Sequence, residues 1–245
     1  MKSFGFFCGL GNFFCENFKK YYTKKIIYKI INVMKSEFAQ KFNHDGIASD
    51  YDENIQNEIN PIRTGYNSLM KWIKNKTKQS NIIVDLGCGT GNTSNQIKPD
   101  KKIYCVDISQ NMIDIAKDKL KHNDNVTFIK DDFLGFFENF KNDKQIDTII
   151  STYAIHHLTQ NEKHILFEKI FDFLPKNGKI VFGDLMFKNK EYENEMKNKY
   201  PDLIEDFDDE LYWYLDDESK KLELLGFKIE IKKFSDLSWG IYGVK

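Results

Sequence analysis

The sequence is poor in arginine, and this absence excludes one large class of partners. Arg63 is the only arginine among 36 basic residues, and the formal net charge is −1. Arginine is the residue that reads phosphates and bases through paired hydrogen bonds. A chain without a basic excess also has no general electrostatic attraction to nucleic acid. We therefore expect no nucleic-acid partner.

Cysteine and proline are also scarce. The four cysteines form no CxxC pair, and no histidine cluster lies near them in the sequence. This pattern indicates neither a zinc site nor a disulfide framework, so we expect no metal ion and a reducing compartment, the cytoplasm. Only four prolines occur, and no repeat or Pro/Gly/Ser-rich linker divides the 245 residues. That length suffices for one large domain.

The first 33 residues differ from the rest of the chain. An uncharged run from Phe4 to Cys15 has 12 residues, whereas a membrane-spanning helix needs roughly 20. Lysines follow this run. A signal peptide would instead end in a cleavage site of small residues, and the sequence has none there. Met34 is a candidate native start. We expect residues 1–33 to be an extension outside the fold, dispensable or not translated, with a basic membrane-surface segment as the alternative, and no stable membrane association.

From residue 34 onward, short apolar runs alternate with amphipathic stretches. Residues 34–78 are predicted to form helices that serve as an N-terminal lid, and residues 79–186 to form the ligand-binding core. Residues 187–245 are predicted to form helices and a closing hairpin, so that 34–245 make one domain. The sequence predicts seven strands, at residues 82–86, 102–107, 126–130, 147–152, 178–186, 227–234 and 239–245.

The order of these elements predicts an α/β fold. Five strands that alternate with helices form a parallel, doubly wound sheet. The last two strands are joined by only four or five residues and must pair as an antiparallel hairpin. We therefore expect a Rossmann-like, doubly wound seven-stranded sheet, mostly parallel, with one antiparallel edge strand and helices on both faces.

The stretch "NIIVDLGCGTGNTS" (81–94) places three glycines directly after a predicted strand and before a helix. Glycines at such a turn let the backbone approach a ligand without a Cβ atom in the way. Asp107 ends the next strand, 20 residues after Gly87, where a carboxylate can accept hydrogen bonds from both hydroxyls of a ribose. The pattern predicts a cofactor that carries adenosine.

The spacing of the glycines and the charge of Asp85 indicate which cofactor this is. A dinucleotide fingerprint reads GxGxxG, whereas Gly87, Gly89 and Gly91 are spaced GxGxG. The carboxylate of Asp85 would repel a pyrophosphate and attract an ammonium group. S-adenosyl-L-methionine has no phosphate and carries an α-ammonium and a sulfonium. We therefore predict S-adenosyl-L-methionine as the cofactor, with a nicotinamide dinucleotide as the disfavoured alternative.

Four stretches resemble the successive motifs of class I S-adenosylmethionine-dependent methyltransferases. They read "VDLGCGTG" (84–91), "VDIS" (106–109), "KDDF" (130–133) and "STYAIHHL" (151–158). The resemblance covers roughly residues 38–245. With "DYDE" before the core, "YAIHHLT" after the fourth strand and a tryptophan in the last hairpin, the chain is similar to a branch of small bacterial methyltransferases, mostly of unassigned substrate.

The resemblance implies which residues contact the cofactor. Asp107 would hold the ribose diol, and Asp132, rather than Asp131, would accept a hydrogen bond from the adenine amino group. The other implied contacts are Gly87 and Gly89 with the methionine and ribose part, Met112 with the adenine face, the backbone of Phe133 beside the adenine, and Ser151 under the sulfonium end.

The sequence offers fewer candidate catalytic residues than candidate cofactor contacts. Methyl transfer depends mainly on the alignment of the methyl donor with the nucleophile, and it uses a base only when the nucleophile arrives protonated. His156 either faces the substrate as a general base or packs internally, and His157 is assigned to packing or the cofactor loop. Tyr51 either folds over the cofactor as part of the lid or packs on the sheet edge. Asp184 lies at the end of the fifth predicted strand, where it either contacts the substrate or caps a turn.

The predicted function is a S-adenosylmethionine-dependent methyltransferase that acts on a small-molecule acceptor, as a monomer or homodimer. Amino-methylating enzymes of nucleic acids often carry a [DNS]PP[YF] motif after the fourth strand, and "STYAIHH" (151–157) has no proline. A noncatalytic protein that binds S-adenosylmethionine or its product is the alternative from another class.

Overall fold

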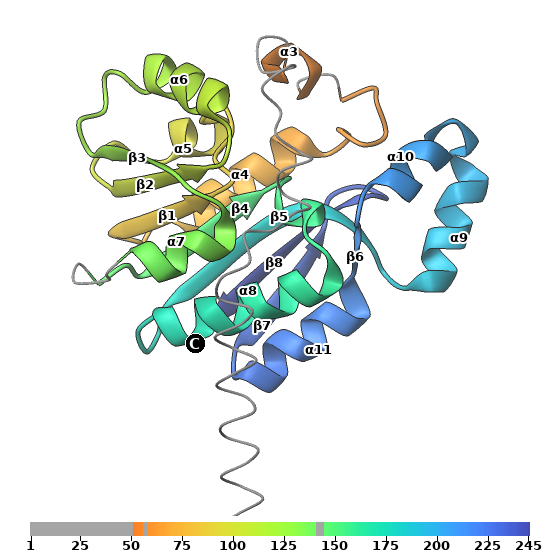
Figure 1. The fold of residues 1–245 in the computed structure, drawn as a ribbon. Coiled ribbons are helices and arrows are strands. Elements are labelled where there is room, and N and C mark those ends of the chain that lie inside the picture. Colours follow the sequence, from red (N-terminus) through yellow and green to blue (C-terminus); the bar gives the residue numbers. More distant parts are fainter. Residues whose placement is uncertain (1–50, 56–57, 141–144) are drawn as a thin grey trace, which may run out of the picture. The chain divides into compact units, whose positions relative to one another are not determined.

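A computed structural model describes residues 51–55, 58–140 and 145–245, all of which belong to one compact unit of the chain (Figure 1). The predicted extension at residues 1–33 and the start of the predicted lid lie outside the described residues. No helix in the described ranges combines the length and the apolar character needed to cross a membrane.

The central sheet has the strand order β3-β2-β1-β4-β5-β8-β7. The strands from β1 to β5 pair in parallel, and β8 pairs antiparallel with both β5 and β7. The predicted mostly parallel sheet with an antiparallel edge is confirmed, and the strand that runs against the others lies one position inside that edge. These strands are β1 (Ile82–Leu86), β2 (Lys102–Asp107), β3 (Val126–Lys130), β4 (Thr148–Thr152), β5 (Lys179–Phe187), β7 (Lys228–Lys233) and β8 (Ser238–Val244).

The predicted number of seven strands is wrong, because the sheet has eight. The additional strand, β6 (Trp213–Tyr214), pairs in parallel with the end of β5, where Met186 faces Trp213. Two residues are too short to show the alternation by which a strand is recognised in a sequence. They also lie in an acidic stretch that the sequence pattern predicts to be mostly helical.

The helices begin and end where the local sequence supplies the capping groups. The Ser109 side chain accepts a hydrogen bond from Met112 N at the start of α6, and Gly226 ends α11 at φ 115°. Thr159 and Glu162 form a capping box on α8. The helices are α3 (Tyr51–Ile55), α4 (Tyr66–Lys76), α5 (Asn92–Gln96), α6 (Gln110–Lys119), α7 (Phe133–Asn139), α8 (Gln160–Phe173), α9 (Lys190–Lys199), α10 (Ile204–Asp209) and α11 (Leu215–Leu225), with the short 3₁₀ turns η2 (Ile155–His157) and η3 (Pro201–Leu203).

Alternate residues of the central strands build two separate cores, one on each face of the sheet. Val84 of β1 packs in the core that contains Phe167 of α8. Its neighbour Ile83 packs in the core that contains Leu69 of α4. Both faces are therefore covered, as a parallel sheet requires, and Figure 1 shows α8 and α11 together on one of them.

The topology also fixes where a ligand can bind. From β1 the chain proceeds outward to β2 and β3, and then returns to place β4 on the other side of β1. The loops after β1 and β4 therefore leave the sheet in opposite directions and open a crevice at the carboxyl ends of these strands. The glycine loop, Asp107, Asp132 and the turn that carries both histidines follow the carboxyl ends of β1, β2, β3 and β4 and therefore lie at or next to this edge.

Candidate functional site

A cavity with about 600 Å³ of empty space lies at the carboxyl ends of β1, β2, β3 and β4. It brings together residues from four loops that are far apart in the sequence. Seven of the ten residues predicted for the site line it: Tyr51, Gly87, Gly89, Asp107, Met112, Asp132 and Phe133. The other three, Asp85, Ser151 and His156, do not line it.

The two glycines after β1 serve different purposes. Both have positive φ, 69° at Gly87 and 50° at Gly89, which side chains disfavour. A Cβ atom added at Gly89 would meet nothing within 4 Å, so this residue borders open space. A Cβ atom at Gly87 would lie 2.5 Å from the Cβ atom of Ala154. Gly89 thus leaves room for a ligand, whereas Gly87 allows the loops after β1 and β4 to pack.

Asp107 fixes the shape of the glycine loop. Its Oδ2 atom accepts a hydrogen bond from the backbone N–H of Gly89 at 2.7 Å, and Oδ1 accepts one from the N–H of Ser109 at 2.9 Å. A carboxylate has about four lone-pair directions, so it can accept further hydrogen bonds from a ligand. The carboxylate lies in the cavity wall, where the two hydroxyls of a ribose can reach it.

The two adjacent aspartates after β3, Asp131 and Asp132, differ in how many of their oxygens accept hydrogen bonds within the protein. Asp131 uses both oxygens internally, accepting from Asp132 N at 2.9 Å and from the Asn139 side chain at 2.8 Å. Asp132 caps α7 through Oδ1 alone, which accepts from Leu134 N and Gly135 N. Its Oδ2 receives no hydrogen bond from the part of the chain that the structure describes. Asp132 is therefore the better acceptor for a ligand.

A smaller cavity of about 310 Å³ adjoins the larger one and shares Tyr51, Gly87, Gly89 and Tyr153 with it. The Oγ1 atom of Thr152 in its wall is buried and has no hydrogen-bond partner among the described residues. A buried hydroxyl without a partner is unfavourable, and a polar ligand group would relieve it.

Asp52 connects α3, part of the predicted lid, to the loop after β1. Its carboxylate accepts hydrogen bonds from Thr90 at 2.5 Å and Asn92 at 2.7 Å, and forms an ion pair with Lys119 at 2.6 Å. Burial raises the pKa of Asp52, but the hydrogen bonds from Lys119, Thr90 and Asn92 outweigh this effect, so the pKa is lowered overall. The charged form of Asp52 thus holds α3 against the loop after β1.

Asp85 is buried behind the glycine loop, with 1% of its surface exposed. Its Oδ2 atom accepts a hydrogen bond from Ser94 at 2.6 Å, and Oδ1 has no partner in the described ranges. Burial raises the pKa of Asp85 to about 7; the Ser94 hydrogen bond opposes this rise and the Asp107 carboxylate adds to it. Ser151 is also buried, and its hydroxyl donates to the Leu86 carbonyl at 2.8 Å, which joins β4 to the end of β1.

Two tyrosines in the cavity walls lie close to the single arginine. Tyr51 and Tyr153 line both cavities, and the Arg63 guanidinium lies 5.9 Å and 5.6 Å from the centres of their rings. Tyr153 has φ 50°, a strained backbone for a tyrosine, and its hydroxyl pairs with that of Ser238 at 2.9 Å. Sequence reasoning missed Tyr153, although it directly follows β4, where site residues of such folds collect.

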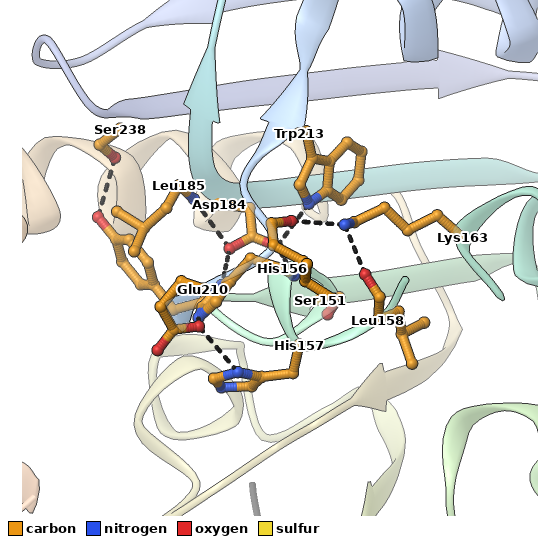
Figure 2. A network of polar contacts seen from close by, with 12 residues as sticks. Ser151, His156, His157, Leu158, Lys163, Asp184, Leu185, Glu210, Trp213 and Ser238 are labelled. Carbon is orange, nitrogen blue, oxygen red and sulfur yellow. Dashed lines mark hydrogen bonds and ion pairs between the residues drawn. The ribbon is translucent and has the colours of Figure 1, made fainter. Parts of the chain in front are cut away.

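Figure 2 shows the two histidines beside Asp184 and Glu210. His156 is buried, its Nδ1 atom contacts Asp184 Oδ1, and its Nε2 atom lies 3.3 Å from Glu210 Oε2. The same Glu210 oxygen lies 3.1 Å from Nδ1 of His157, which lines the larger cavity. Of the two histidines, His157 therefore lines the cavity, and the predicted catalytic candidate His156 does not. Glu210 was missed, because no local pattern distinguishes it within an acidic stretch.

The fold and the cavity define a Rossmann-like α/β protein with a ligand site at the switch point of its sheet. Residues 83–178 match the model of a family described as a methyltransferase domain. An uncharacterized methyltransferase from Alkaliphilus oremlandii is 31% identical over 221 residues, which cover 86% of this chain and 98% of that protein. Another, from Anoxybacillus flavithermus, is 34% identical over 222 residues, which cover 86% of this chain and all of that protein.

Solved structures share the fold at low sequence identity. Magnesium protoporphyrin IX methyltransferase from Synechocystis PCC 6803, with bound S-adenosylmethionine, has a TM-score of 0.60 at 17% identity and covers 86% of this chain and 98% of its own. A complex of DhpI with S-adenosylhomocysteine has a TM-score of 0.62 at 14% identity, covering 84% and 94%. The chain therefore belongs to the class I S-adenosylmethionine-dependent methyltransferases, which take their methyl group from that cofactor.

Proposed function

We propose that this enzyme transfers a methyl group to a small-molecule nucleophile that binds beside Tyr51, Tyr153 and His157. The observation that carries the proposal is the cavity of about 600 Å³, which joins the predicted cofactor residues to this wall of aromatic and imidazole side chains. A net charge of −1 and a single arginine support a small acceptor over a nucleic acid.

The two adjoining cavities fit the two halves of the cofactor. The adenosine half would occupy the larger one, with its ribose on Asp107, its amino group on Oδ2 of Asp132 and its ring against Met112 and the backbone of Phe133. The amino-acid half would occupy the smaller one, past Gly89. Thr152 Oγ1, a buried oxygen in the wall of that cavity without a partner in the described chain, supports a polar group there. Asp85 lines neither cavity, but its Oδ1 also lacks a partner in the described chain, and this carboxylate two residues before Gly87 supports a cationic group.

The chain's own contribution to catalysis is alignment. S-adenosylmethionine supplies an electrophilic methyl group on a good, neutral leaving group. The glycine loop, which Asp107 fixes, and the lid, which Asp52 anchors, hold the methyl donor in place. Tyr51 and Tyr153 exclude water. Such positioning contributes about 7–11 kcal/mol to barrier lowering. A nucleophile that arrives protonated must lose that proton, and His157, in the cavity wall, is better placed to receive it than His156, which does not line the cavity.

A binding comparison followed by a transfer assay tests the proposal. S-adenosylmethionine and S-adenosylhomocysteine should raise the melting temperature and NAD should not, since a ligand at 100 times its dissociation constant adds about 2.7 kcal/mol of stability. Labelled S-adenosylmethionine incubated with a metabolite extract should then yield a labelled product of low molecular mass. Label found only in macromolecules would refute a small acceptor, and binding without any transfer would support the noncatalytic alternative.

A further inference from the structure

Three potential metal ligands converge at the wall of the cofactor cavity. His156, His157 and Glu210 each offer one ligand atom, and these atoms lie within 4.8 Å of one another. The two imidazole nitrogens lie 3.3 Å and 3.1 Å from the same oxygen of Glu210. Figure 2 shows the Glu210 side chain beside both rings, below the buried Asp184.

These separations match those of ligands around a metal ion. Ligand atoms about 2.1 Å from a metal lie roughly 3.0–3.4 Å apart when they meet at octahedral or tetrahedral angles. Two of the three pairs already fall in this range. The donors, two imidazoles and one carboxylate, are the set that proteins use for divalent first-row transition metals, with positions left open for other ligands.

The second observation is the way in which His156 is held. Its Nδ1 atom is bonded to Asp184, so the ring presents Nε2 to Glu210. A metal-binding histidine commonly donates its other nitrogen to a carboxylate in this manner, which fixes the ring and strengthens its donor atom.

The surroundings keep the three ligands in place before any ion binds. Asp184 also accepts a hydrogen bond from the Trp213 indole at 3.1 Å and one from the backbone N–H of His156 at 3.0 Å. The ammonium group of the buried Lys163 donates to the carbonyls of Leu158 and Leu211. These bonds join the segment that carries Glu210 to the turn that carries both histidines.

We propose that His156, His157 and Glu210 bind a divalent first-row transition-metal ion at the wall of the reaction cavity, with Asp184 orienting His156. His157 lines the cavity and Glu210 is about one-quarter exposed, so an ion held here has access to ligands from the cavity. The ion can therefore hold an oxygen or nitrogen atom of the methyl acceptor, and with the ion bound His157 serves as a ligand and not as a base; this last step rests on the proposed function.

Titration of the chelator-stripped full-length protein with Co²⁺ tests the site directly. We expect one ion per chain and the visible absorption spectrum of Co²⁺ bound to nitrogen and oxygen ligands. Glu210→Gln should weaken this binding by at least about tenfold, the lower end of what even outer-shell changes cause. Thermal unfolding without metal and calorimetry with S-adenosylhomocysteine show whether the variant is folded.

The chain contains a matched control. His164 and Glu168 form an exposed pair on α8, with His164 Nε2 and Glu168 Oε1 3.3 Å apart, the same separation as between His156 and Glu210. Glu168→Gln should leave the Co²⁺ spectrum and affinity unchanged. Equal effects of the two substitutions, or no stoichiometric binding by the parent protein, would overturn the metal site.

The step that involves the acceptor is tested separately. Methyl transfer into the metabolite extract should fall after chelation and recover on addition of Zn²⁺ or Co²⁺ in the parent protein and in Glu168→Gln. A rate that does not depend on metal, in a protein that binds Co²⁺, would overturn this step alone. Failure of S-adenosylhomocysteine to bind would instead refute the proposed function, because Co²⁺ binding does not depend on the cofactor.

Discussion

Replacing Asp85 by asparagine should change how the stability of the ligand-free protein depends on pH. Burial raises the pKa of Asp85 to about 7, from the usual value of 3.8. Between these two pH values the folded protein holds a proton that the unfolded chain has lost. The wild type therefore loses stability as the pH rises from about 4 to about 7 through this group, whereas Asp85→Asn has no such loss.

The size of the effect follows from the shift in pKa. A rise of about three units, at about 1.4 kcal/mol for each unit, is of the order of 4 kcal/mol. Asp85 is 1% exposed, so solvent screens this interaction little. We expect the free energy of unfolding of Asp85→Asn, relative to the wild type, to increase by this amount between pH 4 and pH 8. Taking the difference between the two proteins cancels groups that titrate in both.

Urea unfolding of both proteins at several pH values measures this difference. Saturating S-adenosylhomocysteine should flatten the wild-type profile, because its ammonium group would keep Asp85 ionised, and should leave the shape of the Asp85→Asn profile unchanged. Parallel profiles without ligand would refute the raised pKa. A wild-type profile that keeps its slope in the presence of ligand would refute the placement of the ammonium group beside Asp85.

Three further predictions concern the cofactor pocket. Asp107→Asn should weaken binding of S-adenosylhomocysteine by about 1.5–3 kcal/mol in calorimetry, and unchanged affinity would remove Asp107 from the site. Gly89→Val should abolish ligand binding, whereas Gly87→Ala should mainly lower the melting temperature through its collision with Ala154; the reverse pattern would contradict their assignments. Asp52 has a lowered pKa, so it stabilises the fold above pH 3.8 and this contribution is lost as the pH falls through its folded value. Asp52→Asn should therefore flatten the acid limb of the stability curve and weaken cofactor binding, and an identical acid limb would exclude Asp52 as the anchor of the lid.

Much of the fold was predictable from the sequence, because it depends on groups close together in the chain. The strand from Ile82 to Leu86 is a contiguous apolar run, and Ser109 and Gly226 cap helices through contacts with residues a few positions away. The strand, glycine loop and Asp107 belong to adjacent elements of one βαβ unit, so their spacing alone indicates a ribose site. Gly87, Gly89 and Asp107 line the cavity for this reason.

Only the tertiary structure decided the features that depend on distant parts of the chain. β8 lies between β5 and β7, and β6 pairs with β5, as a result of packing rather than of local pattern. Ser151 bonds to Leu86 and Asp85 to Ser94, which the spacing of the motifs does not reveal. Glu210 reaches His156 and His157 because a separate segment folds back over the end of β5.

The sequence by itself therefore determined the order of the strands along the chain through short-range periodicity, the cofactor through the chemistry of neighbouring residues, and the family through the resemblance of its motifs. It gave no reason to expect a metal ion, because the third ligand, Glu210, lies far along the chain from the adjacent pair His156 and His157. Their meeting required loop closure across the acidic segment, held by the buried bonds of Lys163 and Asp184. Contacts of this kind exist only once the chain has folded.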